Sequence, residues 1–443
     1  MPPEPPAPPP TRTSLPRASL EAAPPAVSSA SGPAPSPLAG YTPPTTVQAL
    51  AEEEIEVAQR LMEEFPGDPS PIGLVGNVYS KHGRNSDAIK HWQRCLELDP
   101  RRATAYDAMG MVALLSDEHE KAASLLRKAL EIDPQMPNVH YRLARALVGL
   151  GQLQQAAAAL EKDIAISPTA CNSYVLLGQI RLQLGDAPEA KASYEAAAKI
   201  RPNLADAYYG LATACKRLNL AEESRRHMEK FRQLKAEDSR TDRERRSEYD
   251  DLGVMRPRTA ETYHHAAEFY LAHGNAAKAE QLWRRAAVLD PQAAVCREKL
   301  ALLLEGNGRR EEALQLWQQI RDLEPENLTC YLKLGELHAG LGQLDAAERA
   351  FADARRVAPE HSSGYRGLAQ IYLQTSRNLA EALMLARTAV RLDPAAPNYF
   401  VLAVACANNA DRAGALAAIE RAVALDPRNA RYKDVYERLH QKR

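Results

Sequence analysis

From about residue 45 onward, apolar, small and polar positions return with a period of 34 residues. A period of this length accommodates two short antiparallel helices joined by tight turns, and self-similarity at a fixed period is typical of a solenoid. Helical patterning begins near Val47, and a proline closes every cycle except the one at 205–238. These prolines are Pro66, Pro100, Pro134, Pro168 and Pro202, followed by Pro291, Pro325, Pro359, Pro394 and Pro427.

Each recurring position has a packing reason. Small residues such as Gly76 and Ala88 let the two helices of a pair approach closely. Bulky residues such as Tyr79 and Trp92 fill the space between one pair and the next. Pro100 cannot continue a helix and restricts the residue before it, so it sets the turn into the following pair. The pattern therefore predicts an all-α chain of stacked helix pairs.

Breaks in the period divide the chain into segments. Residues 239–259 carry mixed charge without the repeat pattern, which favours a solvated helical extension or a linker between two blocks of five repeats. The expected segments are a disordered Pro/Ala/Ser-rich tail at 1–44, an N-terminal capping helix at 45–68, a first block at 69–238, a charged junction at 239–259, a second block at 260–429 and a C-terminal capping helix at 430–443.

The tail at 1–44 holds 15 of the 31 prolines, interleaved with Ala, Ser and Thr. Such a segment has little apolar surface to bury, so we expect a disordered, partly polyproline-II tether. The expected location of the protein is the cytoplasm. A periplasmic or envelope-associated location is the alternative if a signal upstream of this tether is missing from the sequence.

Composition argues against several classes of function. With 56 basic and 57 acidic residues and a formal net charge of -1, the chain has no general attraction for nucleic acid. No stretch reaches the roughly 20 apolar residues of a membrane span. The six cysteines form no CxxC pair, which disfavours a zinc knuckle or a disulfide framework. Phosphate loops, nucleophile elbows and His-Glu-x-x-His motifs do not occur, so we expect no enzyme, no cofactor and no metal site.

The aligned repeats resemble the tetratricopeptide-repeat family over about residues 45–443. The fourth repeat carries the pattern as Tyr174, Leu177-Gly178, Ala190, Tyr194 and Pro202. The resemblance implies a right-handed superhelical solenoid of about ten helix-turn-helix repeats, in which the first helix of each repeat lines a concave groove that binds peptides, helices or partner domains. Some repeats depart from the pattern, with Ser224 and Met228 in the fifth and Arg297 in the seventh.

The geometry of that family assigns groove-facing residues to the outer side of each first helix. Arginine and tyrosine are enriched at interface hot spots, so the cluster of Tyr141, Arg142 and Arg145 is the most binding-like part. A merely solvated groove is the alternative for each of these residues. The candidate partner-binding residues are Asn77, Asp107, Asn138, Tyr141, Arg142, Arg145, Gln179, Tyr209, Lys216, His264, Glu268, Lys333 and Arg366.

Two specialised grooves of the family are matched poorly. A clamp for an acidic C-terminus requires lysines, asparagines and an arginine in three successive repeats. Asn77 and Arg142 fit that clamp, whereas Gly73, Ala108 and Asn138 stand where lysine, asparagine and lysine are required. The groove of O-linked sugar transferases requires one asparagine per repeat at a fixed position, and the chain has no such ladder.

In the second half, His264 and Glu268 lie four residues apart on one first helix and could ligate a metal ion. That spacing supplies two ligands, and zinc normally takes three or four from the protein, so a polar groove face is the favoured interpretation. Lys333 and Arg366 are expected to line the next part of the groove.

Together these patterns predict a protein-interaction scaffold or adaptor that binds a peptide or partner protein in its groove. One alternative is a tethered bacterial factor for envelope assembly or secretion. Another is a regulatory subunit of a partner enzyme, such as a glycosyltransferase. The oligomeric state is left open.

Overall fold

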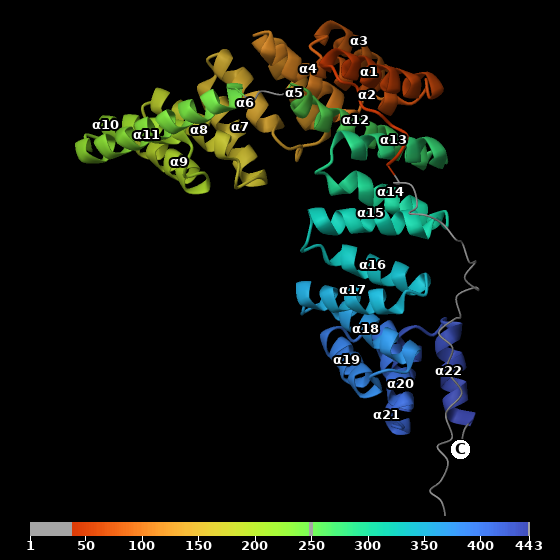
Figure 1. Ribbon diagram of the computed structural model, residues 1–443. Helices are drawn as coiled ribbons and strands as arrows, with labels where there is room; N and C mark the ends of the chain where they lie inside the picture. Colours follow the sequence, from red (N-terminus) through yellow and green to blue (C-terminus); the bar gives the residue numbers. More distant parts are fainter. Residues whose placement is uncertain (1–37, 248–250, 442–443) are drawn as a thin grey trace, which may run out of the picture. The chain divides into compact units, whose positions relative to one another are not determined.

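The computed structural model describes residues 38–247 and 251–441, and the part it describes is built from helices without strands (Figure 1). Most of the predicted tail at 1–44 lies outside the described residues. None of the described helices is both long enough and apolar enough to cross a membrane. The prediction of an all-α helical-repeat solenoid is confirmed.

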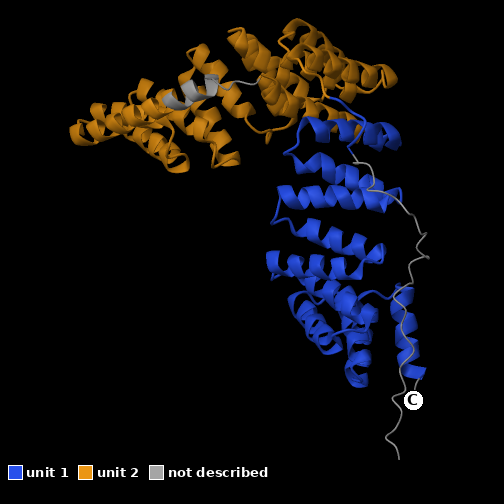
Figure 2. Ribbon diagram, in the orientation of Figure 1, with its two compact units in different colours: residues 1–42, 270–443 blue, residues 43–269 orange. Residues whose placement is uncertain are grey.

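The chain divides into two compact units (Figure 2). One comprises residues 43–269, and the other comprises residues 270–443 with 1–42. The helices of the first unit are α1 (Val47–Glu64), α2 (Pro69–Lys81), α3 (Asn85–Leu98), α4 (Ala103–Leu115), α5 (His119–Ile132), α6 (Val139–Gly149), α7 (Leu153–Ile166), α8 (Cys171–Gln183), α9 (Ala187–Ile200), α10 (Ala205–Arg217), α11 (Ala221–Ser247) and most of α12 (Asp251–Ala272).

The second unit repeats the same helix pairs. Its helices are α13 (Ala276–Leu289), α14 (Ala294–Gly306), α15 (Arg310–Leu323), α16 (Leu328–Gly340), α17 (Leu344–Val357), α18 (Ser362–Thr375), α19 (Leu379–Leu392), α20 (Ala396–Asn408), α21 (Arg412–Leu425) and α22 (Ala430–Gln441). In α22, Tyr432 stacks on Phe400 of α20, with ring centroids 5.0 Å apart.

Close packing within the pairs depends on glycine, as the sequence predicts. A Cβ atom added to Gly178 of α8 would lie 2.9 Å from the Tyr194 ring of α9. In the second unit, a Cβ atom on Gly335 would lie 2.7 Å from the Phe351 ring. Real Cβ atoms do not approach other atoms so closely, so only glycine permits these helix–helix distances. The turn between α6 and α7 uses Gly151 at φ 71°, a conformation that residues with side chains rarely adopt.

Arg297 departs from the repeat pattern, and its hydrogen-bond donors find acceptors close by. Arg297 is 5% exposed and stands where other repeats have an aromatic residue. Its guanidinium donates to Gln319 Oε1 and to the backbone carbonyls of Asp290, Ala293 and Ala287, at 2.9–3.3 Å. Burial lowers the pKa of this guanidinium. Arginine is therefore tolerated at this position because buried carbonyls take up its donors.

The region of the predicted junction at 239–259 continues the helices on both sides. Helix α11 extends to Ser247, residues 248–250 lie outside the described part, and α12 begins at Asp251. The boundary between the two compact units falls within α12, between residues 269 and 270. The assignment of 239–259 as a junction between two repeat blocks stays a prediction.

Candidate functional site

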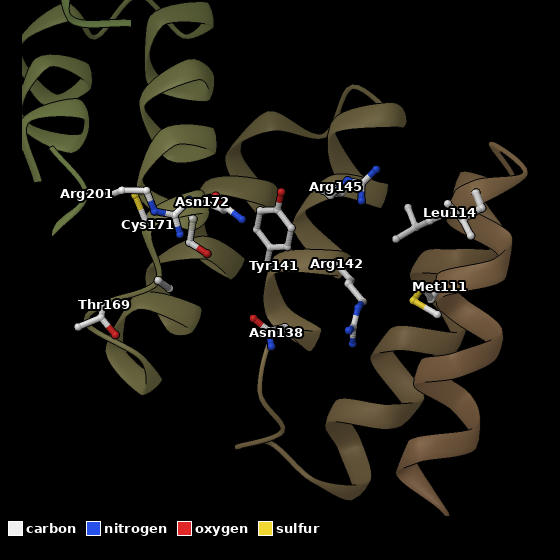
Figure 3. A pocket seen from close by; sticks show the side chains of 13 residues that line it. Met111, Leu114, Asn138, Tyr141, Arg142, Arg145, Thr169, Cys171, Asn172 and Arg201 are labelled. Atoms are coloured by element: carbon white, nitrogen blue, oxygen red, sulfur yellow. The ribbon is translucent and has the colours of Figure 1, made fainter. Parts of the chain in front are cut away.

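A cavity of about 440 Å³ lies within residues 43–269, where the first helices of three successive pairs, α4, α6 and α8, come together (Figure 3). Each of three consecutive repeats thus contributes its first helix to the wall of the cavity. The lining residues are Met111, Leu114 and Leu115 of α4, Asn138, Tyr141, Arg142 and Arg145 at and in α6, Thr169, Ala170, Cys171, Asn172 and Ser173 at the start of α8, and Arg201 after α9.

The central wall of the cavity is helix α6. Asn138 precedes the helix in the left-handed conformation, at φ 62°, which short polar side chains tolerate better than most. Tyr141 and Arg145 are four residues apart and therefore share one face of α6. In the view of Figure 3 the Tyr141 ring lies between Asn172 and Arg145. The first turns of α6 thus present an aromatic ring and a cation together.

Arg142 is held by an acidic residue of the preceding repeat. Its Nη1 atom lies 2.7 Å from both carboxylate oxygens of Asp107 on α4. Burial raises the pKa of the Asp107 carboxyl, and the positive charge of Arg142 partly offsets that effect. Arg142 therefore ties α6 to α4 and has little net charge to offer a ligand.

The other two arginines at the cavity differ from Arg142. Arg145 and Arg201 are exposed and make no ion pair with any described carboxylate. The thirteen lining residues include no aspartate or glutamate. Two uncompensated guanidinium groups at one cavity make it electropositive, and guanidinium groups bind carboxylates through paired hydrogen bonds.

Apolar surface lies beside these charges. Leu115 is 68% exposed and Met111 is 37% exposed at the end of α4. Exposed side chains of this size are common singly, but these two line the same cavity as Tyr141. The cavity therefore combines positively charged guanidinium groups with exposed apolar surface.

Several predicted groove residues of the first unit lie away from this cavity. The Asn77 side chain accepts a hydrogen bond from Trp92 Nε1 at 3.0 Å, so it supports the α2–α3 pair. The Tyr209 ring lies against Phe231 with centroids 5.3 Å apart. Gln179 and Lys216 are exposed on α8 and α10 and do not line the cavity.

The remaining predicted residues are engaged with neighbouring side chains. Lys333 Nζ lies 3.0 Å from Glu305 Oε2 in the second unit. Arg366 donates to Asn398 Oδ1 at 3.3 Å. In the first unit, His264 Nε2 and Glu268 Oε1 are 3.5 Å apart. Of the thirteen predicted residues, the cavity brings together Asn138, Tyr141, Arg142 and Arg145.

Arg201 and Leu115 are site residues that the sequence analysis missed. Arg201 follows the second helix of its repeat, and the prediction considered first helices alone. Leu115 is the last residue of α4, where the repeat pattern does not distinguish an exposed leucine from a packed one. An inventory of the arginines that flank each helix pair would have included Arg201.

Comparison with protein families gives consistent matches. Three family models, each described as a tetratricopeptide repeat, match the chain. Together they cover residues 76–137, 113–174, 172–204 and 304–372. No curated protein gives a significant match.

Solved structures with similar helix pairs include MamA, with 22% identity over 38% of this chain and 97% of that one, at a TM-score of 0.36. YrrB, described as a tetratricopeptide-repeat protein with an unusual peptide-binding site, has 23% identity over 40% of this chain and 91% of its own, at a TM-score of 0.37. A thermophilic tetratricopeptide-repeat protein of Thermus thermophilus has 20% identity over 41% and 98%, at a TM-score of 0.33.

Proposed function

Because the chain belongs to the tetratricopeptide-repeat family, whose helix pairs generally form non-catalytic protein-interaction scaffolds, we propose that it binds an extended segment of a partner protein in the cavity of α4, α6 and α8. The bound segment carries a carboxylate, supplied by an acidic side chain or a C-terminus, next to an apolar side chain. The proposal concerns the unit formed by residues 43–269 alone.

The observation that carries this proposal is the placement of Arg145 and Arg201 without acidic partners at one cavity. A carboxylate there gains charge-assisted hydrogen bonds, which are stronger than those between neutral groups. Tyr141 offers a rigid amphipathic ring, and Leu115 offers exposed apolar surface. Stacked helix pairs hold these groups in place before the ligand arrives, which reduces the entropic cost of binding.

The site differs from a two-carboxylate clamp in the role of its best-matching arginine. Arg142 occupies a clamp position, but Asp107 neutralises it at 2.7 Å. A ligand carboxylate near Arg142 would meet the Asp107 charge as well. Arg145 and Arg201 are therefore the proposed anchors, one on each side of Tyr141 in the view of Figure 3.

A selection from a random peptide library tests this function. The full chain is presented as bait, and unbound peptides are removed at low and at physiological salt. Enriched sequences are expected to share one or two acidic residues beside an apolar residue, because the cavity supplies the complementary groups. Binding of a selected peptide is then measured with Arg145→Glu and with Arg226→Glu, an exposed arginine on α11 that does not line the cavity.

We expect Arg145→Glu to lower the affinity for the peptide by tenfold or more, because it replaces attraction by repulsion. Each tenfold change in affinity corresponds to roughly 1.4 kcal/mol of binding free energy. Arg226→Glu should leave the affinity within about twofold. Enrichment of peptides without acidic residues, or equal loss of binding in both variants, would contradict the proposed site.

A further inference from the structure

Three side chains with metal-binding atoms meet at the last helix pair before α12. They are Cys215 of α10 with Glu223 and His227 of α11, and one ligand atom from each lies within 4.8 Å of the other two. We propose that these residues hold a divalent transition-metal ion, with Zn²⁺ as the best match. This inference is independent of the peptide site at α4, α6 and α8.

The distances suit a metal ion. Cys215 Sγ lies 3.7 Å from Glu223 Oε2. Zinc bonds of about 2.3 Å to sulfur and about 2.1 Å to oxygen, at a tetrahedral angle, place those two ligand atoms about 3.6 Å apart. Glu223 and His227 are four residues apart on α11 and so share one face of that helix. The His227 ring nitrogen lies within 4.8 Å of the ligand atoms of both other residues.

The charges around the site allow Glu223 to exchange its contact with Lys191 for a contact with the metal ion. Lys191 Nζ lies 2.6 Å from Glu223 Oε2 and 3.7 Å from Glu195 Oε1. When Glu223 binds the ion, Lys191 keeps Glu195 as its partner. The Cys215 thiol gives its proton to solvent and binds as a thiolate, so one proton is released per ion. Cys215 is fully buried and the Glu223 side chain is 33% exposed, so solvent can reach the site from the Glu223 side and water can complete the coordination.

The donor set selects the class of metal. One thiolate, one imidazole and one carboxylate favour Zn²⁺ and related ions over Mg²⁺ and Ca²⁺, which prefer oxygen ligands throughout. No other repeat has Cys, Glu and His together at these three positions of the cycle. The fifth repeat is also the one in which Ser224 and Met228 replace the alanine and the aromatic residue of the packing pattern. A bound ion would join α10 to α11 in the repeat that departs from that pattern.

Titration of the full chain with Co²⁺ tests the site, because cobalt reports thiolate ligation through an intense charge-transfer absorption. The expected result is saturation at one ion per chain, with displacement by Zn²⁺. Cys215→Ser should abolish the band, and Cys406→Ser, which removes another buried thiol, should leave it unchanged. Circular dichroism of each variant checks that the helices are retained.

Two further variants keep the test decisive if Cys215→Ser is poorly folded. His227→Asn should weaken Zn²⁺ binding by about tenfold or more, by analogy with losses at other metal sites. Lys191→Met should strengthen it, because it removes the cation that competes for Glu223. No thiolate band with Co²⁺, a band of equal intensity in Cys215→Ser, or weaker Zn²⁺ binding in a folded Lys191→Met variant would overturn the proposal.

Discussion

Thr259 of α12 donates a hydrogen bond of 2.9 Å to the carboxylate of Glu54 on α1, across 205 residues of sequence. Glu54 is completely buried, and Thr262 also donates to its carboxylate. Lys81 Nζ and His82 Nε2 lie 2.6 and 2.9 Å from its two oxygens. A buried carboxylate with this many partners fixes α12 against the first two helices of the unit.

Removal of this carboxylate should destabilise the first unit strongly. Glu54→Ala removes the carboxylate that accepts hydrogen bonds from Lys81, Thr259 and Thr262, at a cost of about 3 kcal/mol in the free energy of unfolding. Thermal and urea unfolding measure the loss. The control is Glu56→Ala, two residues along α1, where the side chain is 66% exposed and the expected change is below about 0.5 kcal/mol. Equal effects of the two variants would contradict the buried network.

Glycine at the helix–helix contact of α8 and α9 gives a second prediction. Gly178→Leu places its Cβ atom 2.9 Å from the Tyr194 ring, and the remaining atoms add to that overlap. Overpacking of this kind costs about 1–3 kcal/mol, measured as a lower midpoint of urea unfolding. Gly306→Ala is the matched control, since its Cβ atom meets no atom within 4 Å, and it should be neutral or slightly stabilising. An unchanged midpoint for Gly178→Leu would refute the packing argument.

Because Tyr194 is buried, we expect the free energy of unfolding to fall at alkaline pH. Burial raises the pKa of its phenol from 10.0 to about 12, because the ionised form loses hydration in the core. The unfolded chain therefore releases this proton first as the pH rises. The contribution of Tyr194 to stability is complete below pH 10 and is lost between pH 10 and about 12, by up to about 1.4 kcal/mol per pH unit.

Tyr194→Phe should remove that part of the pH dependence. The comparison is the free energy of unfolding at pH 8 and at pH 11 for the wild type and the variant. The wild type should lose more stability than the variant over this interval. Identical losses would show that Tyr194 ionises equally readily in the folded and unfolded states.

The pairing of Arg142 with Asp107 predicts a gain of binding. Asp107→Asn removes the negative charge that neutralises Arg142 and leaves a third arginine available at the cavity. An acidic peptide selected on the wild type should bind this variant several-fold more tightly, with a steeper dependence on salt. Fluorescence polarisation at two salt concentrations measures both. Weaker binding by a folded Asp107→Asn variant would contradict the assignment of Asp107 as a competitor of the ligand.

The fold was predictable from the sequence because the residues that pack the two helices of a repeat lie within that repeat. Gly178 and Tyr194, for example, recur in register with equivalent residues in other repeats. The cluster of Tyr141 and Arg145 was also predictable, since helical spacing alone places both on one face. Repetition therefore reveals both the helix pairs and the surface that successive first helices share.

The finer features depend on contacts between repeats, which no local pattern specifies. The neutralisation of Arg142 by Asp107 arises across 35 residues, and Arg201 reaches the cavity from a turn. Cys215 and His227 lie on different helices with a turn between them, so motif spacing did not join them. Such features follow from the stacking geometry rather than from the period.

A charge-swap experiment at Arg145 tests directly whether the cavity binds an acidic peptide. Affinity of a selected acidic peptide, and of the same peptide with its acidic residues replaced by lysine, is measured against the wild type and against Arg145→Glu. We expect the variant to lose the acidic peptide and to bind the lysine peptide, because the contact is electrostatic and local to Arg145. If the variant loses the acidic peptide without gaining the lysine peptide, or binds the acidic peptide as the wild type does, Arg145 is not the anchor and the cavity is not the binding site.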